Sequence, residues 1–350
     1  MEVIKKNAAR FDSLDCVRGI AAIIVMLYHY GDHCNLHYFP GAWVSVDLFF
    51  ILSGFVISHS YGRKILSGMN FLEFIKIRLI RLAPLYFIAL LLGIFAALLT
   101  TKGRENEIYT LGVFGIFLIP SDSQMTWPFG LDYVQGSLFP LNDPSWSLFF
   151  ELFANIFFFW YVSKFKHYSS ITFVFLCFLL YIFLTFLTKQ VNPGWSYDYM
   201  YVGFIRVFYT FFIGALIYGI DNKRNFQFSV AVPVAMFFLC LLNSTKIAFA
   251  NSVIIAPLAI YVLSQVKINN NFKRIMCSAF GEISYPVYII HFPIFRLLYP
   301  ILKRLASPII VIVIISLTTI AISGLLVQVD CIVRKYLNKK ILSRTPLAAA

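Results

Sequence analysis

The sequence predicts an all-α, polytopic membrane protein, and three observations lead to that prediction. Sixty per cent of the 350 residues are hydrophobic and only 13% are charged, whereas a soluble domain carries about 25% charged residues. The mean hydropathy is +0.79. Apolar residues gather into long runs, and most lysines and arginines lie between those runs. We expect one membrane-embedded domain over residues 1–345 and an unstructured tail at 346–350.

Eleven apolar runs mark the candidate helices. They cover about residues 17–33, 42–60, 82–100, 109–120, 145–163, 169–187, 200–220, 228–243, 247–265, 276–298 and 307–329. A helix needs about 20 residues to cross a bilayer, and the run at 109–120 is too short to do so. We therefore expect about ten transmembrane helices and one short interfacial or re-entrant segment.

The distribution of positive charge predicts the orientation, because lysine and arginine concentrate in cytoplasmic loops. The segment 61–81 carries five of these residues and is predicted to be cytoplasmic, whereas 31–41 and 121–144 carry none and are predicted to be external. With ten crossings, both termini are then cytoplasmic. The net charge of +13 is explained by this topology, and we expect no nucleic acid as a partner.

The first apolar run has a charged residue at each end, Arg18 and His29. Their separation corresponds to about 20° from three full helical turns, so both side chains lie on one face of a helix. The rise between them is roughly 16 Å, about half of a bilayer core. If Arg18 is at the cytoplasmic surface, His29 lies well inside, where an ionisable residue indicates function.

Five ionisable residues fall at a similar distance from the predicted external ends of their helices. They are His29, Asp47, Glu151, Arg206 and His291. At 1.5 Å per residue, each lies roughly 6–10 Å inside. Buried charges are tolerated when they are paired, so this layer is either a catalytic site or a structural ion-pair network.

Within this layer His29 is the candidate general base, because a neutral imidazole can accept a proton near neutral pH. Asp47 or Glu151 is the candidate partner that orients it, and the sequence does not choose between them. Asp47 could instead neutralise Arg206. His291 follows Pro286, which should kink its helix, and both packing and site-lining are compatible with its position.

Arg78 and Arg81 lie three residues apart, side by side on a helix that enters the membrane. Such residues ordinarily anchor a helix end by reaching to the interface. The alternative is a pair of phosphate ligands, because guanidinium groups bind phosphate through two hydrogen bonds.

A metal site is the weaker interpretation of the histidines near position 30. His29, His33 and His37 recur every four residues, with Cys34 between them, and His and Cys are zinc ligands. However, the chain beyond Gly31 should be a loop that ends at Pro40, so the helical spacing should not persist. We expect no metal.

Several of these segments together resemble the acyltransferase-3 family of bacterial membrane acyltransferases. The matching pieces are Arg18 with His29, Val46–Phe55, Arg78 with Arg81, Pro144–Leu148 with Glu151, and Ser284–Pro286 with His291. Each piece is short, but the set occurs in the expected order and is specific.

The resemblance implies a ten-helix enzyme of the bacterial cytoplasmic membrane. It would transfer an acyl group, usually acetyl, from cytosolic acyl-CoA to a hydroxyl group of a cell-surface or lipid-linked glycan. It implies that His29 is catalytic and that Arg18, Arg78 and Arg81 serve activity or donor binding. The remaining candidates, assigned to substrate binding, are Trp146, Ser147, Arg206 and His291.

Two mechanisms and one rival function stay open from the sequence. His29 could take the proton of the acceptor hydroxyl as it attacks the thioester, or form an acyl-histidine intermediate. The rival is a transporter or flippase for a glycan or small solute, because mid-membrane polar residues also occur in carriers. Binding of acetyl-CoA would separate the enzyme from the carrier.

Overall fold

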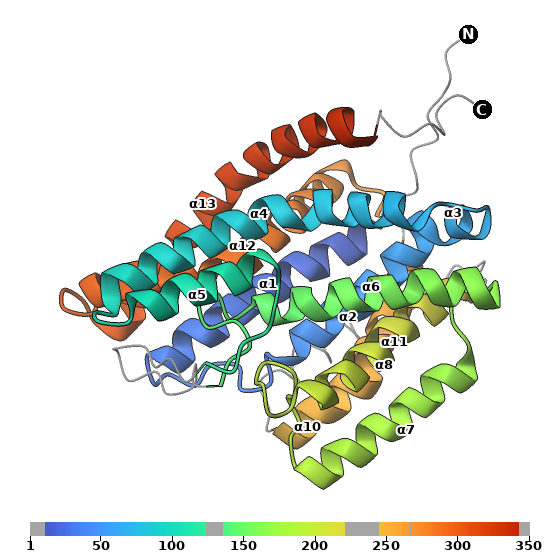
Figure 1. The fold of residues 1–350 in the computed structure, drawn as a ribbon, viewed down its shortest axis with the longest axis horizontal. Helices are drawn as coiled ribbons and strands as arrows, with labels where there is room; N and C mark the ends of the chain where they lie inside the picture. The colour runs from blue at the N-terminus through green and yellow to red at the C-terminus, as the bar shows by residue number, and fades with distance from the viewer. Residues whose placement is uncertain (1–10, 124–135, 221–244, 267, 343–350) are drawn as a thin grey trace.

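The protein is a bundle of long helices that run broadly along one axis, as the computed structural model shows (Figure 1). The structure describes residues 11–123, 136–220, 245–266 and 268–342. Its helices are α1 (Asp12–His33), α2 (Val44–Ile57), α3 (Arg63–Leu66), α4 (Phe71–Thr100), α5 (Glu105–Ile116), α6 (Ser145–Phe165), α7 (Ile171–Thr188), α8 (Met200–Gly219), α10 (Thr245–Ala250), α11 (Ala256–Leu263), α12 (Asn271–Leu302) and α13 (Pro308–Leu337). Short π-helical turns follow α2, α10 and α13, at Ser58–Gly62, Asn251–Ile255 and Asn338–Leu342.

Eight helices of the described chain are long and apolar enough to cross a membrane. They are α1, α2 continued through α3, α4, α6, α7, α8, α12 and α13. A shorter apolar helix covers Ile247–Leu263, and the run expected at 228–243 lies outside the described residues. The all-α polytopic fold predicted from the sequence is therefore confirmed.

The short run expected at 109–120 overlaps α5 (Glu105–Ile116), which begins four residues earlier and has 12 residues. At 1.5 Å per residue it spans about 18 Å, well below the ~30 Å of a bilayer core. It folds back along α4: a Cβ on Gly115 would lie 2.7 Å from the side chain of Leu90, and the Tyr86 hydroxyl donates to the Gly115 carbonyl at 2.5 Å. The pair α4–α5 is thus a helical hairpin with one short arm.

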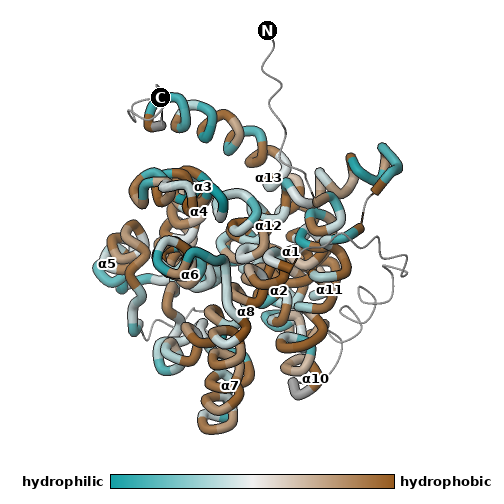
Figure 2. Tube along the Cα trace, turned by 90° about the vertical axis from the view of Figure 1, so that its right-hand side faces the viewer, coloured by the Kyte–Doolittle hydropathy of each residue, from teal (hydrophilic) through white to brown (hydrophobic). Residues whose placement is uncertain are grey.

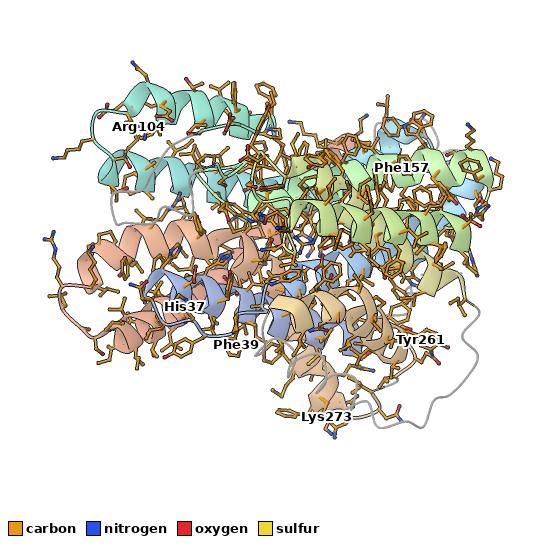
Figure 3. The ribbon with its side chains drawn as sticks, turned by 90° about the horizontal axis from the view of Figure 1, so that it is seen from below. His37, Phe39, Arg104, Phe157, Tyr261 and Lys273 are labelled. Atoms are coloured by element: carbon orange, nitrogen blue, oxygen red, sulfur yellow. The ribbon has the colours of Figure 1, made fainter. Side chains whose placement is uncertain are left out.

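The two ends of the bundle are identified by the segments that lie there. The start of α1, the segment α3 and the end of α13 lie at one end (Figure 1). His37, beyond α1, and Arg104, in the turn between α4 and α5, mark the opposite end (Figure 3). Following the orientation predicted from the sequence, we name the first the cytoplasmic end and the second the external end.

Hydrophobic side chains cover the outside of the bundle as well as its interior. Helix α7 stands at the periphery and is apolar along its length (Figure 2). Its exposed apolar side chains include Phe175, Leu176, Phe183, Phe186 and Leu187. In water such a surface would be an aggregation hazard, and in a bilayer it is the ordinary lipid-facing surface.

Glycines let the helices that build the site approach closely. Helix α1 lies against α12 where Gly19 meets the backbone of Phe280 and Gly281 meets Asp15. Helix α2 crosses α8 where Gly54 faces the Phe211 carbonyl and Gly214 faces the Ile51 carbonyl. A side chain at any of these glycines would collide with the neighbouring helix, as is typical of close helix packing in membranes.

A proline in α12 anchors the loop that precedes α6. Pro293 has no backbone N–H, so the carbonyl of Ile289, four residues earlier, lacks its helical donor. The side-chain amide of Asn142 donates to that carbonyl at 3.0 Å. Arg296 Nη1 donates to the carbonyl of Pro140 at 2.6 Å. The loop therefore enters the bundle, and α6 begins level with the middle of α12 rather than at its external end.

Candidate functional site

A cavity of about 850 Å³, part of it continuous with solvent, lies between α1, α2, α4, α6 and α12. One wall is apolar, and the polar lining consists of Arg18, Ser53, Arg78, Arg81, Ser147, Glu151, Ser284, Tyr285 and Tyr288. The three arginines predicted to bind the donor, Arg18, Arg78 and Arg81, therefore line one cavity.

Arg78 is the most buried cation of the lining, at 8% exposure. Its Nη2 pairs with Glu151 Oε1 at 2.9 Å, and the hydroxyl of Ser53 donates to the same oxygen at 2.7 Å. Its Nε is buried and has no hydrogen-bond partner among the described residues. Because a guanidinium carries five N–H donors in a fixed plane, Arg78 keeps hydrogen-bonding capacity for an anion.

The other two arginines extend this cationic lining. Arg81, three residues along α4, is exposed. Arg18 joins α1 to α12: its Nε donates to the Ser284 hydroxyl at 3.0 Å and its Nη2 to the Gly281 carbonyl at 2.8 Å. Its Nη2 also lies 3.0 Å from Asp15. The predicted donor-binding residues thus converge, although they come from two helices far apart in sequence.

His29 meets a second histidine rather than an acid. Its Nδ1 lies 2.9 Å from His291 Nε2, so His291 and not Asp47 or Glu151 is the partner of the imidazole. His29 is half-buried and His291 is fully buried. The cavity lining includes Tyr288, one turn before His291, and the two rings are 6.1 Å apart. The histidine pair therefore lies beside the inner end of the cavity.

The expected role of Asp47 beside His29 is corrected by the contacts of its carboxylate. Arg206 binds it at both oxygens, Nε to Oδ1 at 2.6 Å and Nη2 to Oδ2 at 3.0 Å. The Ser252 hydroxyl donates to Oδ2 at 2.7 Å. Both members of the ion pair have no solvent exposure. Asp47 therefore neutralises Arg206, which was the alternative left open by the sequence.

Arg206 is equally enclosed, which removes it from the surface that a substrate could reach. Its Nη1 donates to Asn192 Oδ1 at 2.8 Å and to the Pro193 carbonyl at 2.7 Å. Trp43 and Trp146 lie over the guanidinium with ring centres 5.2 and 5.6 Å away. Trp146, predicted to bind substrate, covers this ion pair. Ser147, its neighbour, does line the cavity and accepts a hydrogen bond from the Tyr288 hydroxyl at 2.8 Å.

Glu151 lies nearer the cytoplasmic end than the sequence suggested. Its depth was counted from Ser145 as though α6 began at the membrane surface, but Ser145 follows the loop held beside Ile289. Six further residues carry the chain about 9 Å towards Arg78. The predicted single layer consequently consists of three separate pairs: His29 with His291, Asp47 with Arg206, and Glu151 with Arg78 of the cavity.

A buried acid that the sequence reasoning did not single out lies in the loop before α6. Asp143 is 4% exposed and accepts a hydrogen bond from Ser137. Burial raises the pKa of its carboxyl to about 6, against the opposing effects of Ser137 and the nearby Arg296. Its position directly before the Pro144–Leu148 motif was the available signal.

The histidines near position 30 diverge. Helix α1 continues to His33, two residues beyond the expected loop start, and His33 is buried with its ring stacked on Phe295 at 4.9 Å. His37 is exposed and bonds to Asp32 at 3.1 Å. Among the described residues, no group of three His, Cys, Asp or Glu side chains is placed to hold a metal ion.

A family model described as an acyltransferase domain, of the acyltransferase-3 family, matches residues 11–328. The chain belongs to this family. A Rhizobium radiobacter protein described as "Protein 2 in picA locus" is 37% identical over 161 residues, which cover 42% of this chain and 79% of that protein. No solved structure matches the fold. The family resemblance predicted from the motifs is confirmed, and the protein is a multi-pass membrane acyltransferase.

Proposed function

We propose that this acyltransferase takes an acetyl group from cytosolic acetyl-CoA and passes it to a hydroxyl of a cell-surface or lipid-linked glycan. Its setting would be the bacterial cytoplasmic membrane. The observation that carries the proposal is the cavity itself, which has arginines at one side and the His29–His291 pair beside its inner end. The arginines suit the anionic nucleotide of the acyl donor, and the histidine pair suits its reacting thioester.

The phosphates of the donor are assigned to Arg78, Arg81 and Arg18. Phosphate–guanidinium pairs are short, charge-assisted and frequently bidentate. The Nε of Arg78, which has no hydrogen-bond partner in the described part of the chain, supports this assignment. A buried donor without an acceptor costs about 1–3 kcal/mol, and an incoming phosphate oxygen would satisfy it. Arg81 is exposed and would contribute mainly by steering.

The thin arm of the donor would then extend along α12. Ser284, which binds Arg18, and His291, which binds His29, are seven residues apart on this helix, or about 10 Å. Val46, Phe49 and Leu148 give the intervening wall an apolar surface, while Ser147 and Tyr288 supply hydroxyl groups. An apolar wall with two hydroxyl groups suits an uncharged chain such as the arm of acyl-CoA better than it suits the charged nucleotide.

The chemistry assigned to His29 is general-base catalysis. Neutral His29 accepts the proton of the acceptor hydroxyl while the hydroxyl oxygen attacks the thioester carbonyl. The carbon–sulfur bond then breaks, the acyl group remains on the acceptor oxygen, and the thiolate of CoA takes the proton from the imidazolium. Asp47, Trp146 and Arg206 are structural in this scheme, and Glu151 neutralises Arg78 when no donor is bound.

The decisive experiment measures binding of acetyl-CoA and release of free CoA by the detergent-purified protein, with a glycan-containing membrane extract as acceptor source. Wild type, His29→Ala and the matched control His37→Ala are compared. Release that is lost only in His29→Ala supports the proposal. If the folded wild type binds no acetyl-CoA, the acyl-CoA assignment is wrong.

A further inference from the structure

The two histidines belong to a chain of three groups. The His291 Nδ1 lies 3.2 Å from the carbonyl oxygen of Val287, and the His291 Nε2 lies 2.9 Å from the His29 Nδ1. A carbonyl oxygen can only accept a hydrogen bond. The proton of a neutral His291 must therefore be on Nδ1, which leaves its Nε2 as an acceptor.

This assignment determines the proton position on the next ring. Because His291 Nε2 accepts, the His29 Nδ1 must donate, and a neutral imidazole carries only one N–H. The Nε2 of His29 is then the nitrogen with the free lone pair. Which nitrogen of a histidine is protonated is set by the partner of the other nitrogen, and here that partner is itself oriented by backbone.

His291 is held rigidly enough to impose this choice. It is fully buried. The Tyr30 hydroxyl donates to the backbone carbonyl of His291 at 2.9 Å and lies 2.8 Å from the Thr319 hydroxyl. These contacts join α1, α12 and α13 around the histidine. His29, by contrast, keeps part of its surface exposed, as a group that must meet a substrate requires.

We infer that His291 is a positioning residue that holds His29 in the tautomer protonated at Nδ1, so that His29 Nε2 faces the acceptor hydroxyl as a base. The inference rests on the proposed function of His29. When His29 Nε2 takes the proton of the hydroxyl, the His29 Nδ1–H bond to His291 becomes charge-assisted and therefore stronger. A neutral imidazole thus takes the place that a carboxylate has in a Ser-His-Asp triad.

The test compares His291→Leu, which removes the acceptor, with His291→Gln, whose side-chain oxygen can accept at the position of Nε2. We expect His291→Leu to lower kcat by about 10²–10³-fold, His291→Gln to stay within about tenfold of wild type, and KM for acetyl-CoA to stay within about twofold in both. The exposed His167, changed to Leu and to Gln, is the matched control. Thermal unfolding of each variant excludes loss of fold.

A spectroscopic measurement separates this inference from the proposed function. Solid-state NMR of histidine-labelled protein, with His29→Ala used to assign the signal, reports which nitrogen of His29 is protonated. We expect Nδ1–H in the wild type and His291→Gln, and a shift towards Nε2–H in His291→Leu, whether or not acetyl-CoA is turned over. An unchanged His29 tautomer in a folded His291→Leu protein, or equal losses of kcat in Leu and Gln, would overturn the inference.

Discussion

Two arginine–carboxylate pairs in this protein have the same chemistry and opposite surroundings. Arg206 and Asp47 are joined at both carboxylate oxygens, and neither has any exposure to solvent. Arg78 and Glu151 are joined at one oxygen, and their side chains are 10% and 22% exposed on a cavity wall. The first pair is closed and the second is open.

The difference lies in the hydrogen bonds that remain unused. Asn192, Pro193 and Ser252 complete the closed pair, so a ligand could gain nothing from it without first breaking it. The open pair leaves Arg78 Nε unsatisfied among the described residues. Burial of a charge therefore does not by itself mark a binding site, and the proposed donor site rests instead on the unused donor of Arg78 beside the cavity.

The largest effect should follow from breaking the closed pair. Asp47→Asn leaves Arg206 charged, buried and poorly compensated, and removing one partner of a buried pair costs about 3–5 kcal/mol. Unfolding of the purified protein in mixed detergent micelles measures this, with Asp32→Asn, at the exposed His37 contact, as the control. A stable Asp47→Asn protein that has lost CoA release would instead restore the catalytic role expected from the sequence.

Asp143 is a buried acid without a bidentate arginine, and it should make the stability of the protein depend on pH. Burial raises the folded-state pKa of Asp143 to about 6 from 3.8, so the stability it contributes is present below about pH 4 and is lost as pH rises through 6. The difference between these two pKa values corresponds to about 3 kcal/mol in the free energy of unfolding. Asp143→Asn should flatten this pH dependence of unfolding. Identical pH profiles for the variant and wild type would contradict the assignment.

Substitutions in the open pair, Arg78 and Glu151, should change the affinity for CoA more than the stability of the fold. Arg78→Gln should weaken binding of CoA by about 10- to 100-fold, because a hydrogen bond to a charged group contributes about 1.5–3 kcal/mol. Combining it with Glu151→Gln avoids leaving an unpaired acid. Lys76→Gln, an exposed cation on the same helix, is the control. Unchanged CoA affinity in the folded double variant would show that CoA does not accept a hydrogen bond from the Nε of Arg78.

The smallest effect is expected at Arg81, the exposed neighbour of Arg78. Exposed ion pairs contribute about 0.2–1 kcal/mol and are screened by salt, so Arg81→Gln should weaken CoA binding by no more than about fivefold. Titrations at low and high salt measure this, and the difference from wild type should vanish at high salt. A loss as large as that of Arg78→Gln would mean that exposure does not separate the two arginines.

Features that depend on one helix were predictable from the sequence. Arg18 and His29 do share the face of α1 that packs on α12, and Arg78 and Arg81 do line one cavity. The short α5 was recognisable from its length alone. Helical periodicity and hydropathy are local properties, so they give the face and the approximate depth of a residue within its own helix.

Features that depend on how helices meet were not predictable. Glu151 was misplaced because its helix starts inside the bundle, behind a loop held by Asn142 on a carbonyl freed by Pro293. The partners of Asp47 and His29 were assigned from similar depth, and several groups at one depth can pair in several ways. The hydroxyls of Ser53 and Tyr288, which contact site residues, carried no charge that would have drawn attention to them.

By itself, then, the sequence determined the membrane fold and the family, and it singled out the arginines of the cavity and the histidines of the buried pair as candidate site residues. Only the tertiary structure decided which ionisable groups pair, which of those pairs is sealed and which borders a cavity. The physical reason is that apolar burial along a helix specifies a face and a length, whereas pairing depends on the rotation, register and neighbours of that helix. Those are set by close contacts such as Gly54 on Phe211 and Gly19 on Phe280, which join segments distant in the chain.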